Sequence, residues 1–221
     1  AFSQAFIPIY SEYLGRNDEK GAQNFLNALF GLLLSVLFIF TTTALLFAPI
    51  FILMFAPGFY FDSQKQELAV NLLRIMFPYL ALISLVAFAA GIQNSHNKFS
   101  IPAITPLIFN LSLIGSAWLV APKIGIPVIA LAWGVLLAGF LQLLFQIAPL
   151  ASIKKIPIPK IDLKNSGVKK FFILILPAVI AGGIAQINLL IDTIFASLLI
   201  TGSPTWLYVS DRLIQFPMGI F

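Results

Sequence analysis

The stretch AQNFLNALFGLLLSVLFIFTTTALLFAPIFILMFA, residues 22–56, contains no charged side chain over 35 positions. The hydrocarbon core of a bilayer is about 30 Å thick and requires roughly 20 helical residues to cross. This stretch can therefore span a membrane as a helix, with residues to spare. Because Pro49 lies near its end, we expect the helix to tilt, to bend near Pro49 or to project beyond the bilayer before the APGF turn at 56–59.

Further apolar stretches with short polar breaks follow along the whole chain. They lie at about 68–94, 101–121, 126–150, 171–200 and 204–221, and residues 1–14 resemble the end of another. The alternating pattern of β-barrel strands is missing from the sequence. We predict an all-α, polytopic membrane helical bundle of roughly seven spans. Gln142 and Gln146 lie inside one of these spans, where amide side chains usually hydrogen-bond between helices.

The overall composition agrees with a membrane protein. Of the 221 residues 60% are hydrophobic and 10% are charged, and the mean hydropathy is +1.00; soluble domains are about half apolar and a quarter charged. The chain has no cysteine, which excludes disulfides and cysteine-ligated zinc, and His96 alone cannot form a histidine metal site. The net charge of +5 lies in the polar breaks without a basic-aromatic stripe, which favours anionic lipid over nucleic acid as a partner.

Basic residues in the polar breaks predict the orientation, because short loops rich in Lys and Arg stay on the cytoplasmic side. If the break at 15–21 is cytoplasmic, so are 95–100 and 151–170. These three segments contain nine basic residues: Arg16, Lys20, Lys98, Lys154, Lys155, Lys160, Lys164, Lys169 and Lys170. The opposite breaks, 57–67, 121–126 and 201–204, contain only Lys65 and Lys123.

Residues 151–167, ASIKKIPIPKIDLKNSG, form the longest polar connection between spans. Their Pro and Lys content suits a linker that lies on an anionic cytoplasmic leaflet. A solvated loop without a specific ligand explains the same composition. Because residue 1 and Phe221 both lie inside apolar segments, we expect the chain to be part of a larger, transporter-sized protein.

The last span, WLYVSDRLIQFPMGIF at 206–221, contains the adjacent charges Asp211 and Arg212. A charged residue inside a spanning helix costs about 2.5 to 3.5 kcal/mol on insertion scales, so it usually faces a partner or a water-filled cavity. Counted from the predicted turn at 201–204, both residues lie roughly 12 Å below the outer end, and so does Asp192 on the preceding span. Asp211 and Arg212 project about 100° apart and therefore address different partners.

Three interpretations of these charges are open. In the first, Asp192 or Asp211 neutralises Arg212 as an ion pair within the membrane. In the second, Arg212 presents its guanidinium to an anionic phosphate group in a central cavity. In the third, Asp192, with oxygen donors such as Asn188 or Thr193, coordinates a hard cation or takes a proton that drives transport. The second and third are compatible, and phosphate-loop, HExxH and GxSxG enzyme motifs are missing.

Several segments resemble the MurJ (MviN) family of lipid II flippases, within the multidrug/oligosaccharidyl-lipid/polysaccharide exporter superfamily. The resemblance runs in order through essentially the whole chain. Its segments are AFSQAFIPIYSEY at 1–13, LLRIMFPYLALISL at 72–85, GIQNSHNKFSIPAITPLIFNLSLI at 91–114, ALAWGVLLAGFLQLLFQ at 130–146, INLLIDTIFASLL at 187–199 and WLYVSDRLIQFPMGIF at 206–221.

The resemblance implies an all-α transporter of fourteen helices in two six-helix lobes plus two C-terminal helices. Residues 1–150 would be the end of the N-terminal lobe (helices 2–6), 151–167 the cytoplasmic linker and 168–221 the start of the C-terminal lobe (helices 7–8). Such a protein flips undecaprenyl-diphosphate-linked peptidoglycan precursor across the bacterial inner membrane by alternating access. A related cation-coupled multidrug or polysaccharide-lipid exporter is the alternative.

The resemblance also assigns roles to individual residues. Arg212 matches a cavity arginine that engages the substrate's pyrophosphate, so Arg212 and the adjacent Asp211 are the substrate-binding candidates. Asp192 matches an acidic position that resembles part of a sodium site, which makes it the metal candidate. We expect a transporter and not an enzyme, with no cofactor except this sodium ion. The expected partners are a lipid-linked anionic substrate and membrane lipid, and the full-length protein is expected to be a monomer.

Overall fold

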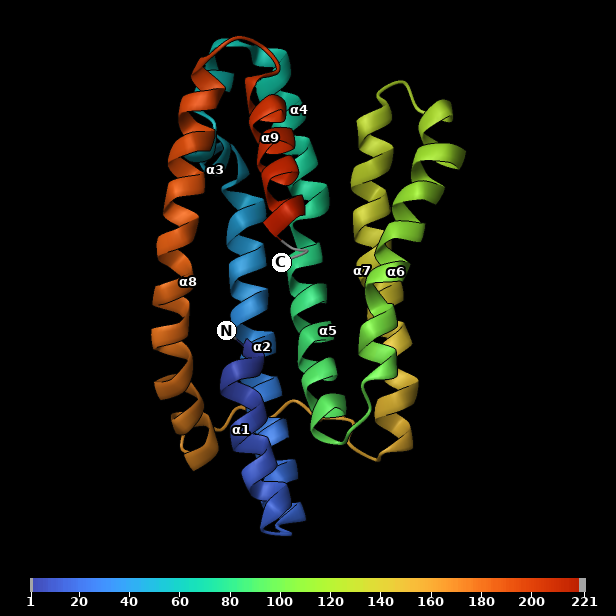
Figure 1. The fold of residues 1–221 in the computed structure, drawn as a ribbon, viewed down its shortest axis with the longest axis vertical. Coiled ribbons are helices and arrows are strands. Elements are labelled where there is room, and N and C mark those ends of the chain that lie inside the picture. The colour runs from blue at the N-terminus through green and yellow to red at the C-terminus, as the bar shows by residue number, and fades with distance from the viewer. Residues whose placement is uncertain (1, 219–221) are drawn as a thin grey trace. The chain divides into compact units, whose positions relative to one another are not determined.

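The computed structural model describes residues 2–218, except for the side chains of residues 185 and 215–218. Within this range the chain is helical and has no β-strand (Figure 1), which confirms the all-α prediction. The α-helices are α1 (Phe2–Gly15), α2 (Glu19–Leu46), α3 (Ala48–Phe55), α4 (Ser63–Met76), α5 (Pro78–Ser95), α6 (Ser100–Gly115), α7 (Pro127–Ser152), α8 (Ser166–Leu198) and α9 (Ser203–Met218). Short helical turns lie at Pro57–Phe61, Ser116–Val120 and Ala121–Lys123.

In the part of the chain that the structure describes, five helical segments are long and apolar enough to cross a membrane, which confirms a multi-pass membrane protein. They are Glu19–Leu46, Ser63–Ser95, Ser100–Lys123, Pro127–Ser152 and Ser166–Leu198. Helices α1 and α9 contain 14 and 16 residues. Both are shorter than the roughly 20 residues of a full crossing. Residues 219–221 of the last predicted span lie outside the described residues.

Prolines divide two of the predicted spans. Helix α2 ends before Phe47, and α3 begins with Pro49 in its first turn. Pro49 has no amide hydrogen for the carbonyl four residues earlier, and its ring clashes with that carbonyl. The helix is therefore interrupted next to Pro49; that it bends there stays a prediction. In the same way Phe77 separates α4 from α5, which begins at Pro78, because proline is tolerated at the start of a helix.

The chain forms two compact units. Unit 1 contains the chain up to Leu46 together with Leu72–Ile180, and unit 2 contains Phe47–Asn71 and the chain from Ala181 onward. Helix α8 therefore contributes its first half to unit 1 and its second half to unit 2. The predicted lobe boundary at 151–167 stays a prediction.

The core of unit 1 is aromatic and joins α1, α2, α5 and the first turns of α8. Phe6 is fully buried, and its ring centroid lies 5.4 Å from Tyr10, 5.9 Å from Phe25 and 5.5 Å from Phe88. Aromatic pairs of this kind contribute about 0.5–1.5 kcal/mol each beyond their buried area. Val168 and Phe171 of α8 belong to the same buried cluster. The beginning of α8 is thus held against α1 and α2 by packing.

Helices α5, α6 and α7 share a buried polar network. Gln93 donates a hydrogen bond to Gln146 Oε1, and Gln146 Nε2 donates to Thr105 Oγ1 at 2.7 Å. Gln142 Nε2 donates to the backbone carbonyl of Thr105 at 3.1 Å. The predicted interhelical role of Gln142 and Gln146 is confirmed. In membrane proteins such bonds contribute about 0.6 kcal/mol on average.

Candidate functional site

The three predicted site residues lie on the α8–α9 hairpin of unit 2. Helix α8 ends at Leu198 and α9 begins at Ser203, and Figure 1 shows α9 running back from the turn in the opposite direction. The amide of Ser203 donates to the carbonyl of Ile200 at 3.1 Å. Gly202 has φ = +104°, a left-handed conformation that glycine adopts without strain. The reversal of the chain therefore depends on this glycine.

The turn end of the hairpin is held by the APGF turn and the start of α4. The amide of Gly58 donates to Ser197 Oγ at 3.1 Å, and Lys65 Nζ donates to Thr201 Oγ1 at 2.9 Å. A Cβ at Gly58 would overlap the backbone carbonyl of Ser197, so only glycine fits there. Asp62 accepts a hydrogen bond from the Lys65 amide at 3.1 Å and pairs with its ammonium at 3.0 Å, which lowers the pKa of Asp62. The ends of α8 and α9 that meet at the turn are thus held in place.

Arg212 stacks on an aromatic ring one helical turn earlier in α9. Its Cζ lies 5.0 Å from the ring centroid of Tyr208. A guanidinium at this distance is attracted to the ring, and its N–H donors point outward in its own plane. Among the described side chains, neither Asp192 nor Asp211 forms an ion pair with Arg212. The guanidinium of this arrangement can donate a pair of hydrogen bonds to an anionic group.

The two carboxylates occupy different positions on the hairpin. Asp211 is half-buried on α9, and Asp192 is exposed on α8. Asp192 precedes the end of α8 by six residues, or roughly 9 Å, and Arg212 follows the start of α9 by nine residues, or roughly 14 Å. Measured from the helix ends at the turn, the depths of Asp192 and Arg212 therefore differ by about one helical turn. Helix α8 ends at Leu198, whereas the predicted span ended at residue 200. That their side chains share one cavity stays a prediction.

The surroundings of Asp192 offer oxygen donors for a cation. Asn188 lies one turn before Asp192 on the same face of α8, and both are exposed. The hydroxyl of Thr193 donates to the carbonyl of Leu189 at 2.7 Å, and its oxygen can still accept or coordinate. Hard cations prefer such carboxylate, amide and hydroxyl oxygens. Among the described residues no group of three His, Cys, Asp or Glu side chains comes together. That Asp192 binds a cation stays a prediction.

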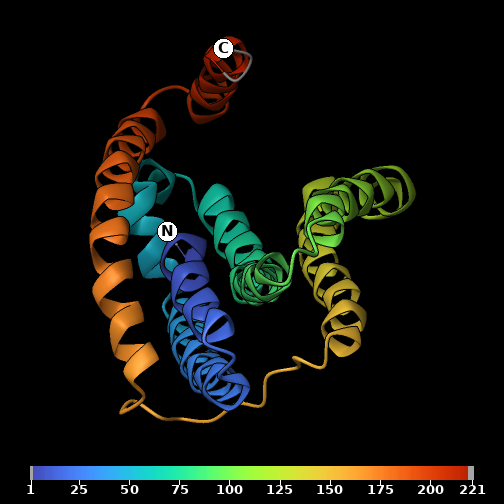
Figure 2. The same ribbon diagram turned by 60° about the horizontal axis from the view of Figure 1, so that its bottom comes forward.

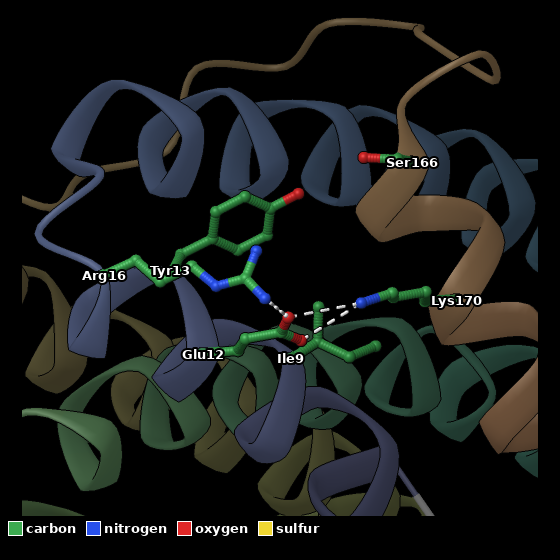
Figure 3. Close-up of a pocket in the computed structure, with 6 residues that line it drawn as sticks. All are labelled: Ile9, Glu12, Tyr13, Arg16, Ser166 and Lys170. Carbon is green, nitrogen blue, oxygen red and sulfur yellow. Dashed lines mark hydrogen bonds and ion pairs between the residues drawn. The ribbon is translucent and has the colours of Figure 1, made fainter.

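A second charged cluster lies in unit 1, where α1 meets the start of α8. The cluster surrounds a cavity of about 130 Å³, which is lined by Glu12, Tyr13, Arg16, Ser166 and Lys170. Figure 3 shows Arg16 and Lys170 both pointing at Glu12, at 2.7 Å and 3.2 Å from its carboxylate oxygens. Because both cations already have a carboxylate partner, this cluster connects two helices and leaves no free cation for an anionic substrate.

Two features of the hairpin are missing from the sequence-based prediction. The Arg212–Tyr208 stack has a visible signal, since the residues are four apart and four-residue spacing places them on one helical face. The hydrogen bond between Gly58 and Ser197 joins residues 139 positions apart. No local pattern predicts that partner, although the APGF sequence does predict a turn.

The fold defines a class: a multi-pass helical membrane protein. The family model described as "Lipid II flippase MurJ" matches residues 1–221. The chain belongs to this family.

Individual relatives agree with the family assignment. The probable lipid II flippase MurJ of Buchnera aphidicola subsp. Acyrthosiphon pisum is 42% identical over 219 residues, which is 99% of this chain and 43% of the relative. The lipid II flippase MurJ of Burkholderia cenocepacia is 36% identical over 100% of this chain and 43% of its own. A solved structure, "Lipid II flippase MurJ, inward closed conformation", superposes with a TM-score of 0.79 at 27% identity, covering 99% of this chain and 44% of that one. The chain spans less than half the length of these relatives.

Proposed function

We propose that this chain is part of a flippase that moves undecaprenyl-diphosphate-linked peptidoglycan precursor (lipid II) across the bacterial inner membrane by alternating access. The observation that carries the proposal is the match of residues 1–221 to the lipid II flippase family. In this proposal 15–21, 95–100 and 151–170 are cytoplasmic. Residues 1–150 and 168–221 belong to the two lobes that rock against each other.

The chemical problem for such a protein is the charge of the diphosphate. An ionised group transferred into an apolar layer without compensation costs tens of kcal/mol in the limit of a fully dry interior. A fixed guanidinium in a wet cleft replaces part of the lost hydration, and the prenyl tail stays in lipid. Arg212 suits this role because its planar fork matches two phosphate oxygens and its stack on Tyr208 restricts its rotation. The carboxylate of Asp211 can accept hydrogen bonds from hydroxyl or amide donors of the head group.

Asp192 is the proposed coupling residue. With the amide oxygen of Asn188 it would supply oxygen ligands to a sodium ion, and the remaining ligands would come from outside this chain's described residues. A bound cation biases the equilibrium between inward-open and outward-open states only if its affinity differs between them. The helix face of Asp192 must therefore change its surroundings when the lobes rock.

The proposal is tested by genetic rescue. The full-length protein is expressed in bacteria depleted of their own lipid II flippase, and colony formation is measured against an empty vector. We expect growth to be restored. Absence of rescue at a membrane abundance equal to that of the host flippase would contradict a lipid II flippase. Export of drugs without rescue would instead support the related exporter.

Asp192→Asn is expected to remove the response to sodium, because the amide keeps the shape but loses the charge that attracts a cation. In the wild-type full-length protein we expect sodium to raise the melting temperature, since a ligand of the folded state stabilises it by mass action. The variant should melt at the same temperature in sodium and in potassium chloride. If Asp192→Asn keeps the full sodium-dependent rise, Asp192 is not a ligand. Asn24→Ala, on an exposed face of α2, serves as the matched control.

A further inference from the structure

The linker between α7 and α8 is not detached from the helices. Figures 1 and 2 show it passing beside α2 before it turns into α8. Its segment KIPIPK, residues 155–160, runs in extended form along α2 and is named here the strap. Pro157 and Pro159 fix two of its φ angles and remove two amide donors, so the segment loses little conformational freedom when it is held in place. The strap is therefore suited to dock as a preorganised segment.

Four residues of α2 receive the strap, and they follow each other at intervals of four. Glu19, Gln23, Asn27 and Gly31 therefore lie along one face of the helix. Each contacts the strap in order: Glu19 pairs with the ammonium of Lys155, and Gln23 Nε2 donates to the carbonyl of Ile156 at 3.4 Å. The Lys155 side chain is largely buried in this contact. Successive polar residues of α2 thus contact successive residues of the strap.

Asn27 makes the central contacts. Its Oδ1 accepts hydrogen bonds from the amide of Ile158 at 2.9 Å and from Gln23 Nε2 at 3.0 Å. Its backbone carbonyl accepts the amide of Lys160 at 3.1 Å. One turn further, a Cβ at Gly31 would overlap the backbone carbonyl of Lys160, so the strap approaches α2 where the helix has no side chain. Asn27 therefore accepts hydrogen bonds from two amides of the strap. The Ile158 amide lies between the two prolines, and the Lys160 amide follows them.

The other end of the linker is also fixed. Asn165 Oδ1 accepts hydrogen bonds from the amides of Gly167 at 2.9 Å and Val168 at 3.3 Å, which caps the start of α8. Lys170 pairs with Glu12 of α1 at 3.2 Å (Figure 3). Only residues 161–164 lie between these contacts and the strap. The start of α8 is thus connected to α2 by a short segment that forms a turn, in which the Asn165 amide donates to the Asp162 carbonyl at 3.4 Å.

We infer that the face Glu19–Gln23–Asn27–Gly31 of α2 is a docking site for the strap, and that Asn27 is a positioning residue that acts through it on α8. The contacts themselves do not depend on the proposed function, but their role rests on it. In a flippase the strap joins the two lobes, so docking makes the linker a rigid part of the α2 side. Rocking must then be absorbed beyond residue 160 and not by a slack tether.

Three variants of Asn27 and its neighbours separate this role from general stability. Asn27→Leu keeps the size of the side chain and removes the acceptor. Asn27→Asp keeps the acceptor, because Oδ1 only accepts in the contacts described above. Gly31→Ala pushes the strap away, although alanine itself favours the helix. Asn24→Ala, exposed on the same helix, is the matched control.

The test measures hydrogen exchange of the full-length protein in nanodiscs, in peptides that contain Ile158 and Lys160. We expect wild type, Asn27→Asp and Asn24→Ala to exchange these amides at least about tenfold more slowly than Asn27→Leu and Gly31→Ala. Exchange in α5–α7 should be unchanged in all five proteins, which shows that the variants fold. Wild-type exchange as fast as in an unstructured peptide, or Asn27→Asp behaving like Asn27→Leu, would overturn the docking site.

A second measurement tests the positioning role. In flippase-depleted cells we expect Asn27→Leu and Gly31→Ala to lower colony formation, and Asn27→Asp to restore it toward wild type. If all variants rescue equally while their hydrogen exchange in the strap differs, the positioning role of Asn27 toward α8 is overturned. If the wild-type protein itself fails to rescue while the strap amides are protected, the flippase proposal fails and the docking site stands.

Discussion

Arg212→Ala is expected to abolish the rescue of flippase-depleted cells at normal membrane abundance. The guanidinium is stacked on Tyr208, and among the described side chains no carboxylate pairs with it, so its donors are free for a phosphate group. Two charge-assisted hydrogen bonds contribute about 1.5–3 kcal/mol each, so losing both lowers transport by a factor on the order of 10² to 10⁴. Colony counts after depletion, with abundance measured by immunoblot, give the result.

Two further variants, Arg212→Lys and Tyr208→Leu, are expected to reduce rescue less than Arg212→Ala does. Lysine keeps the charge but not the planar fork, so we expect partial rescue. Tyr208→Leu removes a stack of about 0.5–2 kcal/mol and should reduce rescue less than Arg212→Ala does. Arg74→Ala is the matched control, because Arg74 is an exposed arginine in the last turn of α4. Wild-type growth of Arg212→Ala would rule out Arg212 as a substrate ligand.

The helical architecture was predictable because membrane helices obey a simple length rule. Long apolar stretches must satisfy their backbone hydrogen bonds internally, so each becomes a helix and the polar breaks become turns. Pro49 predicted a bend for the same local reason. The break at Phe77 has the same local cause, because Pro78 lies within the span predicted at 68–94. Helix α4 begins at Ser63, earlier than its apolar residues, because Asp62 caps it through the Lys65 amide.

The candidate site was predictable only in part. The cost of inserting a charge into an apolar helix is local information, and it selected Asp192, Asp211 and Arg212. Which residues contact these three cannot be predicted from the neighbouring sequence. The same limit applies to the strap: Glu19, Gln23 and Asn27 form a visible polar face on α2, but Ile158 is 131 positions from Asn27. A polar face predicts that something docks there, and only the structure identifies the linker.

Gly58→Ala is expected to disturb the hairpin that carries Arg212 without touching any charged residue. The added methyl would overlap the carbonyl of Ser197, which is backbone and cannot rotate away. The APGF turn must then move, and the hydrogen bond from the Gly58 amide to Ser197 Oγ is lost. Overpacking costs about 1–3 kcal/mol, and an unsatisfied amide adds about 1 kcal/mol or more. We expect a melting temperature several degrees lower in the full-length protein.

Gly115→Ala provides the comparison for this glycine. A Cβ at Gly115 meets nothing within 4 Å, and its φ of −60° is ordinary for a helix. Alanine is favoured over glycine in helices by about 1 kcal/mol, so Gly115→Ala should melt at the same or a higher temperature. Hydrogen exchange in 196–203 should rise in Gly58→Ala alone. Because Arg212 is placed by this hairpin, Gly58→Ala should also weaken rescue while the guanidinium is still present. An unchanged melting temperature together with unchanged exchange would show that the turn does not anchor the hairpin.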